Sequence, residues 1–111
     1  MKLVYSSLEP IDKAEAIEKI FGEDAFEASE ALIRAAHYID DQAWLLSLIK
    51  QRLAAGDVSV QTDTLVALSA LVRNVSDPDL PRIRKLLKAC KANEALVGYC
   101  EDVEDDISRF H

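Results

Sequence analysis

The sequence of 111 residues predicts an all-α protein of about six helices that pack in antiparallel pairs. Three observations support this fold class. Apolar residues recur at the 3.6-residue spacing of amphipathic helices along most of the chain. Only three glycines and three prolines occur, and most of them fall between the periodic stretches. The one strand-like stretch, KLVY at residues 2–5, has no second strand to pair with.

The first three helices are expected within residues 11–56. The first follows Pro10 and ends near Gly22, a suitable C-terminal cap, with an inward stripe of Ile11, Ala14, Ile17, Ile20 and Phe21. The second starts near Asp24, and its apolar positions are Ala25, Ala28, Leu32, Ala36 and Ile39. The third follows Asp40 and Asp41 and stops at Gly56, with inward Leu45, Leu48, Ile49 and Leu53.

The last three helices are expected within residues 60–110. The fourth runs from about Val60 to Val75, and its stripe is Leu65, Leu68, Leu71, Val72 and Val75. The fifth begins in SDPDLP, residues 76–81, where Ser76 or Asp77 can cap the helix and Pro78 suits the first helical position. Its stripe is Leu80, Ile83, Leu86, Leu87 and Cys90. The sixth runs from about Asn93 to Phe110, with inward Leu96, Cys100, Val103, Ile107 and Phe110.

Length and composition predict one soluble domain spanning residues 1–111. Hydrophobic residues make up 50% and charged residues 30%, as is usual for folded soluble proteins. The apolar runs are far shorter than the ~20 residues of a membrane span, and the N-terminal stretch is no signal peptide. We therefore expect a cytoplasmic protein that does not bind membranes. In that compartment Cys90 and Cys100 are expected to be free thiols in the core.

The charge distribution favours a basic protein partner. The net charge is −7, which argues against nucleic acid because phosphate contacts require lysine and arginine. Residues 65–92 carry six basic and two acidic side chains, whereas residues 93–111 carry one basic and six acidic ones. The basic block on the fifth helix is interpreted as a solvated face. In the acidic last helix, acids four residues apart repel each other. No nearby feature of the sequence offsets this repulsion.

The candidate partner-binding residues are four acids and one tryptophan. The acids on the outer side of the last helix are Glu94, Glu101, Glu104 and Asp105. Plain solubility is the alternative account of these acids. Trp44, the only tryptophan, lies beside the apolar stripe of its helix, where it is either a filler at the core edge or an interface anchor.

No motif indicates catalysis, a cofactor or a metal. The chain has no glycine-rich phosphate loop, no nucleophile elbow and no cluster with metal-ligand spacing. His37 has Asp40 and Asp41 close behind it, but a histidine near a helix end is expected to interact with the last carbonyls of that helix. We therefore predict that the protein is not an enzyme.

The chain contains an internal repeat of helix, aspartate turn and helix. Residues 30–49 match residues 66–83 at an offset of 36, which becomes 35 after the aspartate; the matched pairs are Ala31 with Ala67, Leu32 with Leu68, Ile39 with Val75, Asp41 with Asp77, Leu45 with Leu80, and Leu48 with Ile83. ALSALVRNVSDPDLPRIRKLL (67–87) and ALIRAAHYIDDQAWLLSLI (31–49) resemble HEAT-type α-helical repeats over residues 24–92. This resemblance implies a short right-handed stack with a binding surface. The offset is shorter than the ~40–47 residues usual for HEAT, so tetratricopeptide-like pairing stays open.

In size, acidity and lack of chemistry the chain also resembles immunity proteins of bacterial toxin systems, including contact-dependent growth inhibition. That resemblance implies a module that binds and neutralises a basic toxin, often a nuclease. Two alternatives remain. One is an adaptor or scaffold subunit with HEAT-type recognition, and the other is an enzyme whose site is assembled across helices around His37.

Overall fold

A computed structural model describes residues 9–55 and 57–111. It confirms the all-α prediction with six α-helices: α1 (Lys13–Ile20), α2 (Ala25–Tyr38), α3 (Gln42–Ala55), α4 (Val58–Asn74), α5 (Leu80–Cys90) and α6 (Val97–Phe110). A short 3-10 helix, η2 (Glu94–Leu96), leads into α6. The described residues contain no strand, and the strand-like stretch at residues 2–5 lies outside them.

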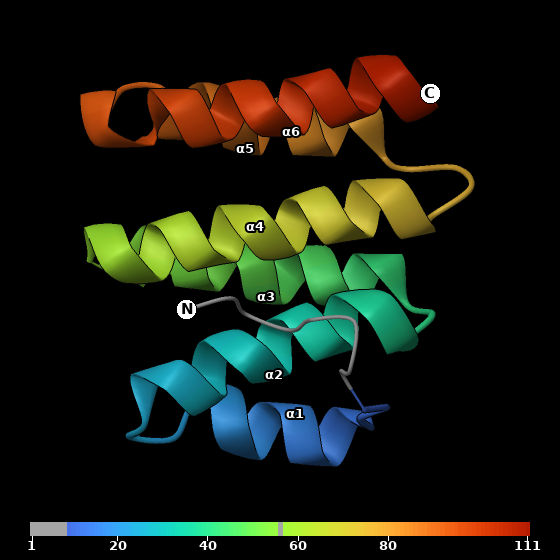
Figure 1. Ribbon diagram of the computed structural model, residues 1–111, viewed down its shortest axis with the longest axis vertical. Helices are drawn as coiled ribbons and strands as arrows, with labels where there is room; N and C mark the ends of the chain where they lie inside the picture. Colours follow the sequence, from blue (N-terminus) through green and yellow to red (C-terminus); the bar gives the residue numbers. More distant parts are fainter. Residues whose placement is uncertain (1–8, 56) are drawn as a thin grey trace.

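The helices form two layers (Figure 1). The layer of α2, α4 and α6 lies in front of the layer of α1, α3 and α5, and consecutive helices run in opposite directions. The most extensive backbone contacts join α2 to α4 and α4 to α6 within the front layer, and α1 to α2 and α3 to α4 between the layers. The contact between α5 and α6 is much smaller. The sequence repeat instead joins α2 with α3 and α4 with α5.

Side-chain hydrogen bonds connect positions about one repeat apart. His37 contacts Asn74, Arg82 donates to Ser47, and Ser29 donates to Asp63, with sequence separations of 37, 35 and 34 residues. The side chain of Gln42 donates to the carbonyl of Asp77, 35 residues away. These contacts tie each helix pair to the next, as expected when repeated units stack.

A hydrophobic core cluster draws side chains from all six helices. Matched positions of the repeat in α2 and α4 have the same burial: Ala31, Ala67, Leu32 and Leu68 are all buried. Ile39 and Val75 are both the C-terminal caps of their helices, each with an extended backbone. The repeat read from the sequence therefore corresponds to similar environments in α2 and α4. The match of Asp41 with Asp77 does not hold, because Asp41 caps α3 whereas Asp79 caps α5.

The predicted inward stripes are wrong at the two ends of the stack. In α1 and its cap, Ala14, Ile17 and Phe21 are exposed, and Ala16 is buried with Ile20 instead. Phe110 at the end of α6 is exposed as well. End helices have a neighbour on one side only, so part of an apolar stripe remains uncovered there. Leu86 of α5 is half-buried and packs at the margin of the core.

The start of α5 also differs from the prediction. Asp79 is the N-cap, and its carboxylate accepts a hydrogen bond from the backbone N–H of Arg82. Pro81 occupies the second helical position, and Pro78 precedes the helix. Asp79 is held by Gln42, whose side-chain oxygen accepts from the Asp79 backbone N–H at 2.5 Å. Capping rules that consider only the neighbouring residues favoured Ser76 or Asp77. Those rules do not take into account a contact with a distant residue such as Gln42.

Asp79→Ala is expected to destabilise the protein by about 0.5–2 kcal/mol, because one N–H of the first turn loses its partner. Asp77→Ala is the matched control, since the structure uses only the backbone carbonyl of Asp77. Urea unfolding of both variants measures the difference. Equal midpoints for the two variants would contradict the assignment of the cap to Asp79.

Candidate functional site

The acids of α6 fall into paired and unpaired groups. Glu104 accepts from the Lys91 ammonium at 2.7 and 2.8 Å, and this contact raises the pKa of Lys91, with a smaller contribution from Glu101. Asp106 is buried and accepts two hydrogen bonds from Arg73, at 3.1 and 3.4 Å. Asp102 and Asp105 have no ion-pair or hydrogen-bond partner among residues 9–55 and 57–111.

The structure separates the residues proposed from sequence as a partner-binding set. Glu94 is exposed on η2, Glu101 and Asp105 are exposed on α6, and Glu104 faces Lys91, the residue that follows α5. Trp44 lies on α3 in the other layer, half-buried against the core. The ammonium of Lys13 sits 5.3 Å from the centroid of the Trp44 ring. Trp44 is thus part of the contact between the end of the stack and α3, away from the acids of α6.

Lys13 also donates to Asp41 at 2.6 Å, and this hydrogen bond lowers the pKa of the Asp41 carboxyl. Asp41 is therefore engaged with α1, and it caps α3 by accepting from the backbone N–H of Trp44. His37 instead contacts the side chain of Asn74 at 3.0 Å. The expected interaction of His37 with helix-end carbonyls is replaced by a contact with the neighbouring pair, and His37 forms no dyad with Asp41.

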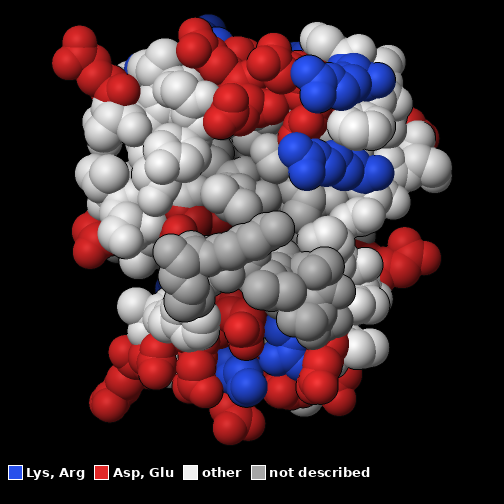
Figure 2. Space-filling model, viewed as in Figure 1, with Lys and Arg blue, Asp and Glu red and all other residues white. Residues whose placement is uncertain are grey.

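A groove of about 600 Å³ crosses the front layer and is lined by side chains of α2, α4 and α6. Its apolar lining comes from Ile33 of α2, from Leu65, Val66 and Ala70 of α4, and from Tyr99 of α6. Its charged lining comes from Arg73, Asp102, Asp105, Asp106 and Arg109. Figure 2 shows acidic side chains gathered over α6 on this face, with basic side chains beside them.

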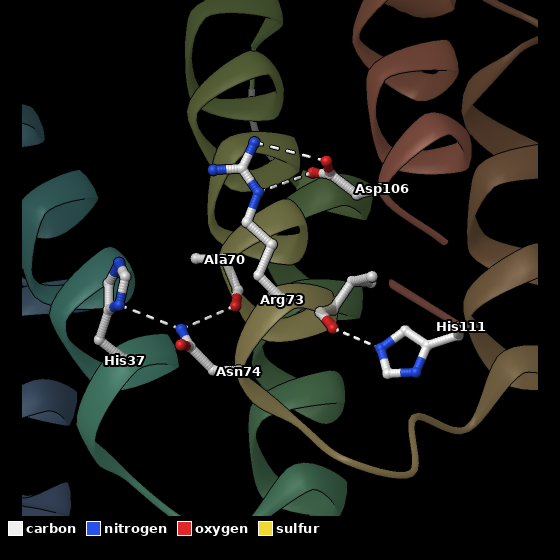
Figure 3. Close-up of polar contacts among 7 residues, drawn as sticks. His37, Ala70, Arg73, Asn74, Asp106 and His111 are labelled. Carbon is white, nitrogen blue, oxygen red and sulfur yellow. Dashed lines mark hydrogen bonds and ion pairs between the residues drawn. The ribbon is translucent and has the colours of Figure 1, made fainter. Parts of the chain in front are cut away.

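Hydrogen bonds fasten one end of this groove (Figure 3). From the C-terminal end of α4, Asn74 reaches His37 of α2, and Arg73 reaches Asp106 of α6. The ring of His111 contacts the carbonyl of Val72 at 2.8 Å. The three helices that line the groove are therefore linked by directed polar contacts as well as by packing.

Tyr99, Asp102 and Arg73 line the groove, although no sequence pattern marked them as candidate binding residues. The spacing of Tyr99, Asp102, Asp106 and Arg109 places them along one side of α6. That periodicity is visible in the sequence. The sequence does not show that α2 and α4 border this side of α6, so the periodicity alone does not identify a groove.

Cys90 and Cys100 are free and buried, as the sequence predicted. Burial raises the pKa of the Cys100 thiol to about 11, and burial also raises the pKa of Cys90. A thiol with a raised pKa is a poor nucleophile near neutral pH, so these side chains behave as core residues.

Among the described residues, no group of three or more His, Cys, Asp or Glu side chains is placed to hold a metal ion. None of the described helices has the length and apolar character that crossing a membrane requires.

Comparison with known proteins finds similarity at the level of structure. No protein-family model and no curated protein matches the chain. A chain in the crystal structure of a CDI complex from Cupriavidus taiwanensis has a similar fold, with a TM-score of 0.86 and 20% sequence identity. The similarity covers 99% of this chain and 99% of that chain. The two chains therefore share one fold from end to end.

Proposed function

We propose that this protein is a non-catalytic immunity protein that binds and neutralises a basic bacterial toxin domain, such as a nuclease, in the cytoplasm. The observation that carries the proposal is the end-to-end fold similarity to a chain of a CDI complex, an assembly in contact-dependent growth inhibition. Because the similarity covers nearly all of both chains, it supports the same kind of role for the whole of this protein.

The charges of the chain support the basic character of the partner. The net charge is −7, and unpaired acids lie on α6 beside an open groove. Complementary charge speeds association and selects partners. The stacking of helix pairs, linked at a spacing of 34–37 residues, supports the resemblance to HEAT-type repeats, which serve as binding surfaces.

Growth protection tests the proposal. The product of the gene adjacent to the gene for this protein, tested as the candidate toxin, is expressed in a heterologous host with and without the protein. We expect growth arrest by the toxin alone and growth on co-expression, together with a complex of the two purified proteins in size-exclusion chromatography. Growth arrest that co-expression leaves unchanged would contradict an immunity function.

Charge removal on α6 should weaken this complex. The triple variant Glu101→Gln, Glu104→Gln, Asp105→Asn is expected to bind the toxin domain at least tenfold more weakly at low salt, about 1.4 kcal/mol. Its melting temperature should stay close to that of the parent, because the exposed Lys91–Glu104 pair contributes little to stability. Isothermal titration calorimetry at several salt concentrations measures the effect.

The triple variant Glu18→Gln, Glu23→Gln, Glu27→Gln is the matched control. It changes the net charge equally, at exposed positions in and next to α1 and α2. Equal weakening by both triples would mean that only overall charge matters. An α6 triple that binds like the parent at every ionic strength would mean that these acids serve solubility.

A further inference from the structure

The groove over α2, α4 and α6 is lined by both paired and unpaired carboxylates. Glu104 is occupied by Lys91 and Asp106 by Arg73, so neither can accept a partner's cation without losing one of its own. Asp102 and Asp105 carry no such pair within the described parts of the chain. Both line the groove. Two carboxylates that can pair with a partner therefore lie together on one wall of the groove, while Glu94 and Glu101 are exposed outside its lining.

An exposed aromatic ring lies next to these carboxylates. Tyr99 precedes Asp102 by three residues on α6 and keeps 42% of its surface exposed. Across the groove, Val66 of α4 keeps 39% of its surface exposed. Apolar surface next to carboxylates suits a side chain that is both cationic and broad. The planar guanidinium of arginine can stack flat on an aromatic ring and form paired hydrogen bonds with carboxylates, whereas the ammonium of lysine is a point charge that lacks this planar geometry.

The two arginines that line the groove leave the end with Tyr99 and Asp102 accessible to a partner. Arg73 is held by the bidentate contact with Asp106, and Arg109 follows Asp106 by three residues, toward the C-terminal end of α6. Tyr99 and Asp102 lie toward the beginning of α6. The groove is therefore acidic and aromatic at one end and basic at the other. This polarity would orient an incoming segment.

Two other surfaces of the molecule suit a basic partner less well. The face of α5 presents the exposed cations Arg84, Lys85 and Lys88, which would repel it. A smaller hollow of about 250 Å³ lies between α3, α4 and α5 and has an apolar lining whose charged member is Lys50. Neither offers a carboxylate.

From this arrangement we infer that the groove is the toxin-binding site of the protein, and that it takes an arginine-bearing segment of the toxin. The guanidinium stacks on Tyr99 and pairs with Asp102 and Asp105, while apolar side chains of the segment cover Val66. The polar links from Arg73 and Asn74 hold α2, α4 and α6 in place before the partner arrives, which lowers the entropy lost on binding. This inference rests on the proposed immunity function.

Paired charge variants test the site. Asp102→Asn with Asp105→Asn removes the two groove carboxylates that have no partner among the described residues, and Glu94→Gln with Glu101→Gln removes two exposed acids outside the groove lining. Calorimetry uses the purified toxin domain encoded by the neighbouring gene, near physiological salt. We expect the groove pair to weaken binding at least tenfold and the outer pair to weaken it less than threefold. Circular dichroism melting should show that both variants fold like the parent.

Variants of Tyr99 test the stacking. Tyr99→Ala is expected to weaken binding about threefold to tenfold, whereas Tyr99→Phe keeps the ring and should bind within twofold of the parent. If the parent binds the toxin domain but the groove variants bind equally well, the groove assignment is wrong while the immunity function stands. If the outer pair weakens binding as much as the groove pair, the groove assignment is also wrong. A parent that binds no toxin domain overturns both.

Discussion

Leu68→Ala is expected to lower the free energy of unfolding by about 2–5 kcal/mol, because it leaves a cavity in the core. Leu68 is fully buried on α4, and α4 packs against α2, α3 and α6. A cavity there is bordered by helices on several sides, so the surrounding side chains have little freedom to collapse into it. Urea unfolding followed by circular dichroism measures the change in midpoint and slope.

Leu86→Ala is the matched control for this prediction. Both residues are leucines on inward stripes, but Leu86 is half-buried at the margin of the core. Its truncation removes less buried surface and should cost about 1 kcal/mol. If the two variants unfold at the same midpoint, the central position of α4 in the fold is wrong.

The order and approximate limits of the helices follow from the sequence because amphipathic spacing is a local property. The stripe of α4 was read correctly at Leu65, Leu68 and Leu71, all of which are buried. The same rule failed at Ile17 and Phe110, which are exposed. A stripe shows which residues share a face of a helix, but the neighbours in the fold decide how much of that face is covered.

The charge pattern of α6 shows a similar division. Composition was enough to mark the helix as unusually acidic, and Asp105 was correctly singled out as an exposed acid. The sequence could not separate Glu104 from Asp102, because the difference depends on Lys91 and on the approach of α4. The acids that are neutralised are those that meet a basic side chain from another part of the chain. Lys91 is 13 residues from Glu104, and Arg73 is 33 residues from Asp106.

Arg34 is the second position where a large loss of stability is expected. It is a buried arginine on α2, with 7% of its surface exposed. Its guanidinium donates to the carbonyl of Glu9 at 2.9 Å and to the carbonyl of Pro10 at 3.0 Å. The carboxylate of Glu15 lies 3.9 Å away. Arg34 therefore fastens the backbone that leads into α1 onto the second helix.

Arg34→Met is expected to destabilise the protein by about 2–4 kcal/mol, because two charge-assisted hydrogen bonds are lost while the apolar stem is roughly preserved. The loss should fall mainly on α1, so amide hydrogen exchange should accelerate at Ala16 and Ile20 more than at Leu68. Arg109→Met is the control, since Arg109 is exposed and should change stability by less than about 0.5 kcal/mol. Uniform acceleration of exchange across α1 and α4 would show that α1 unfolds only together with the whole protein. An Arg34→Met variant as stable as the parent would mean that the packing of Ala16 and Ile20 alone is enough to hold α1 in place.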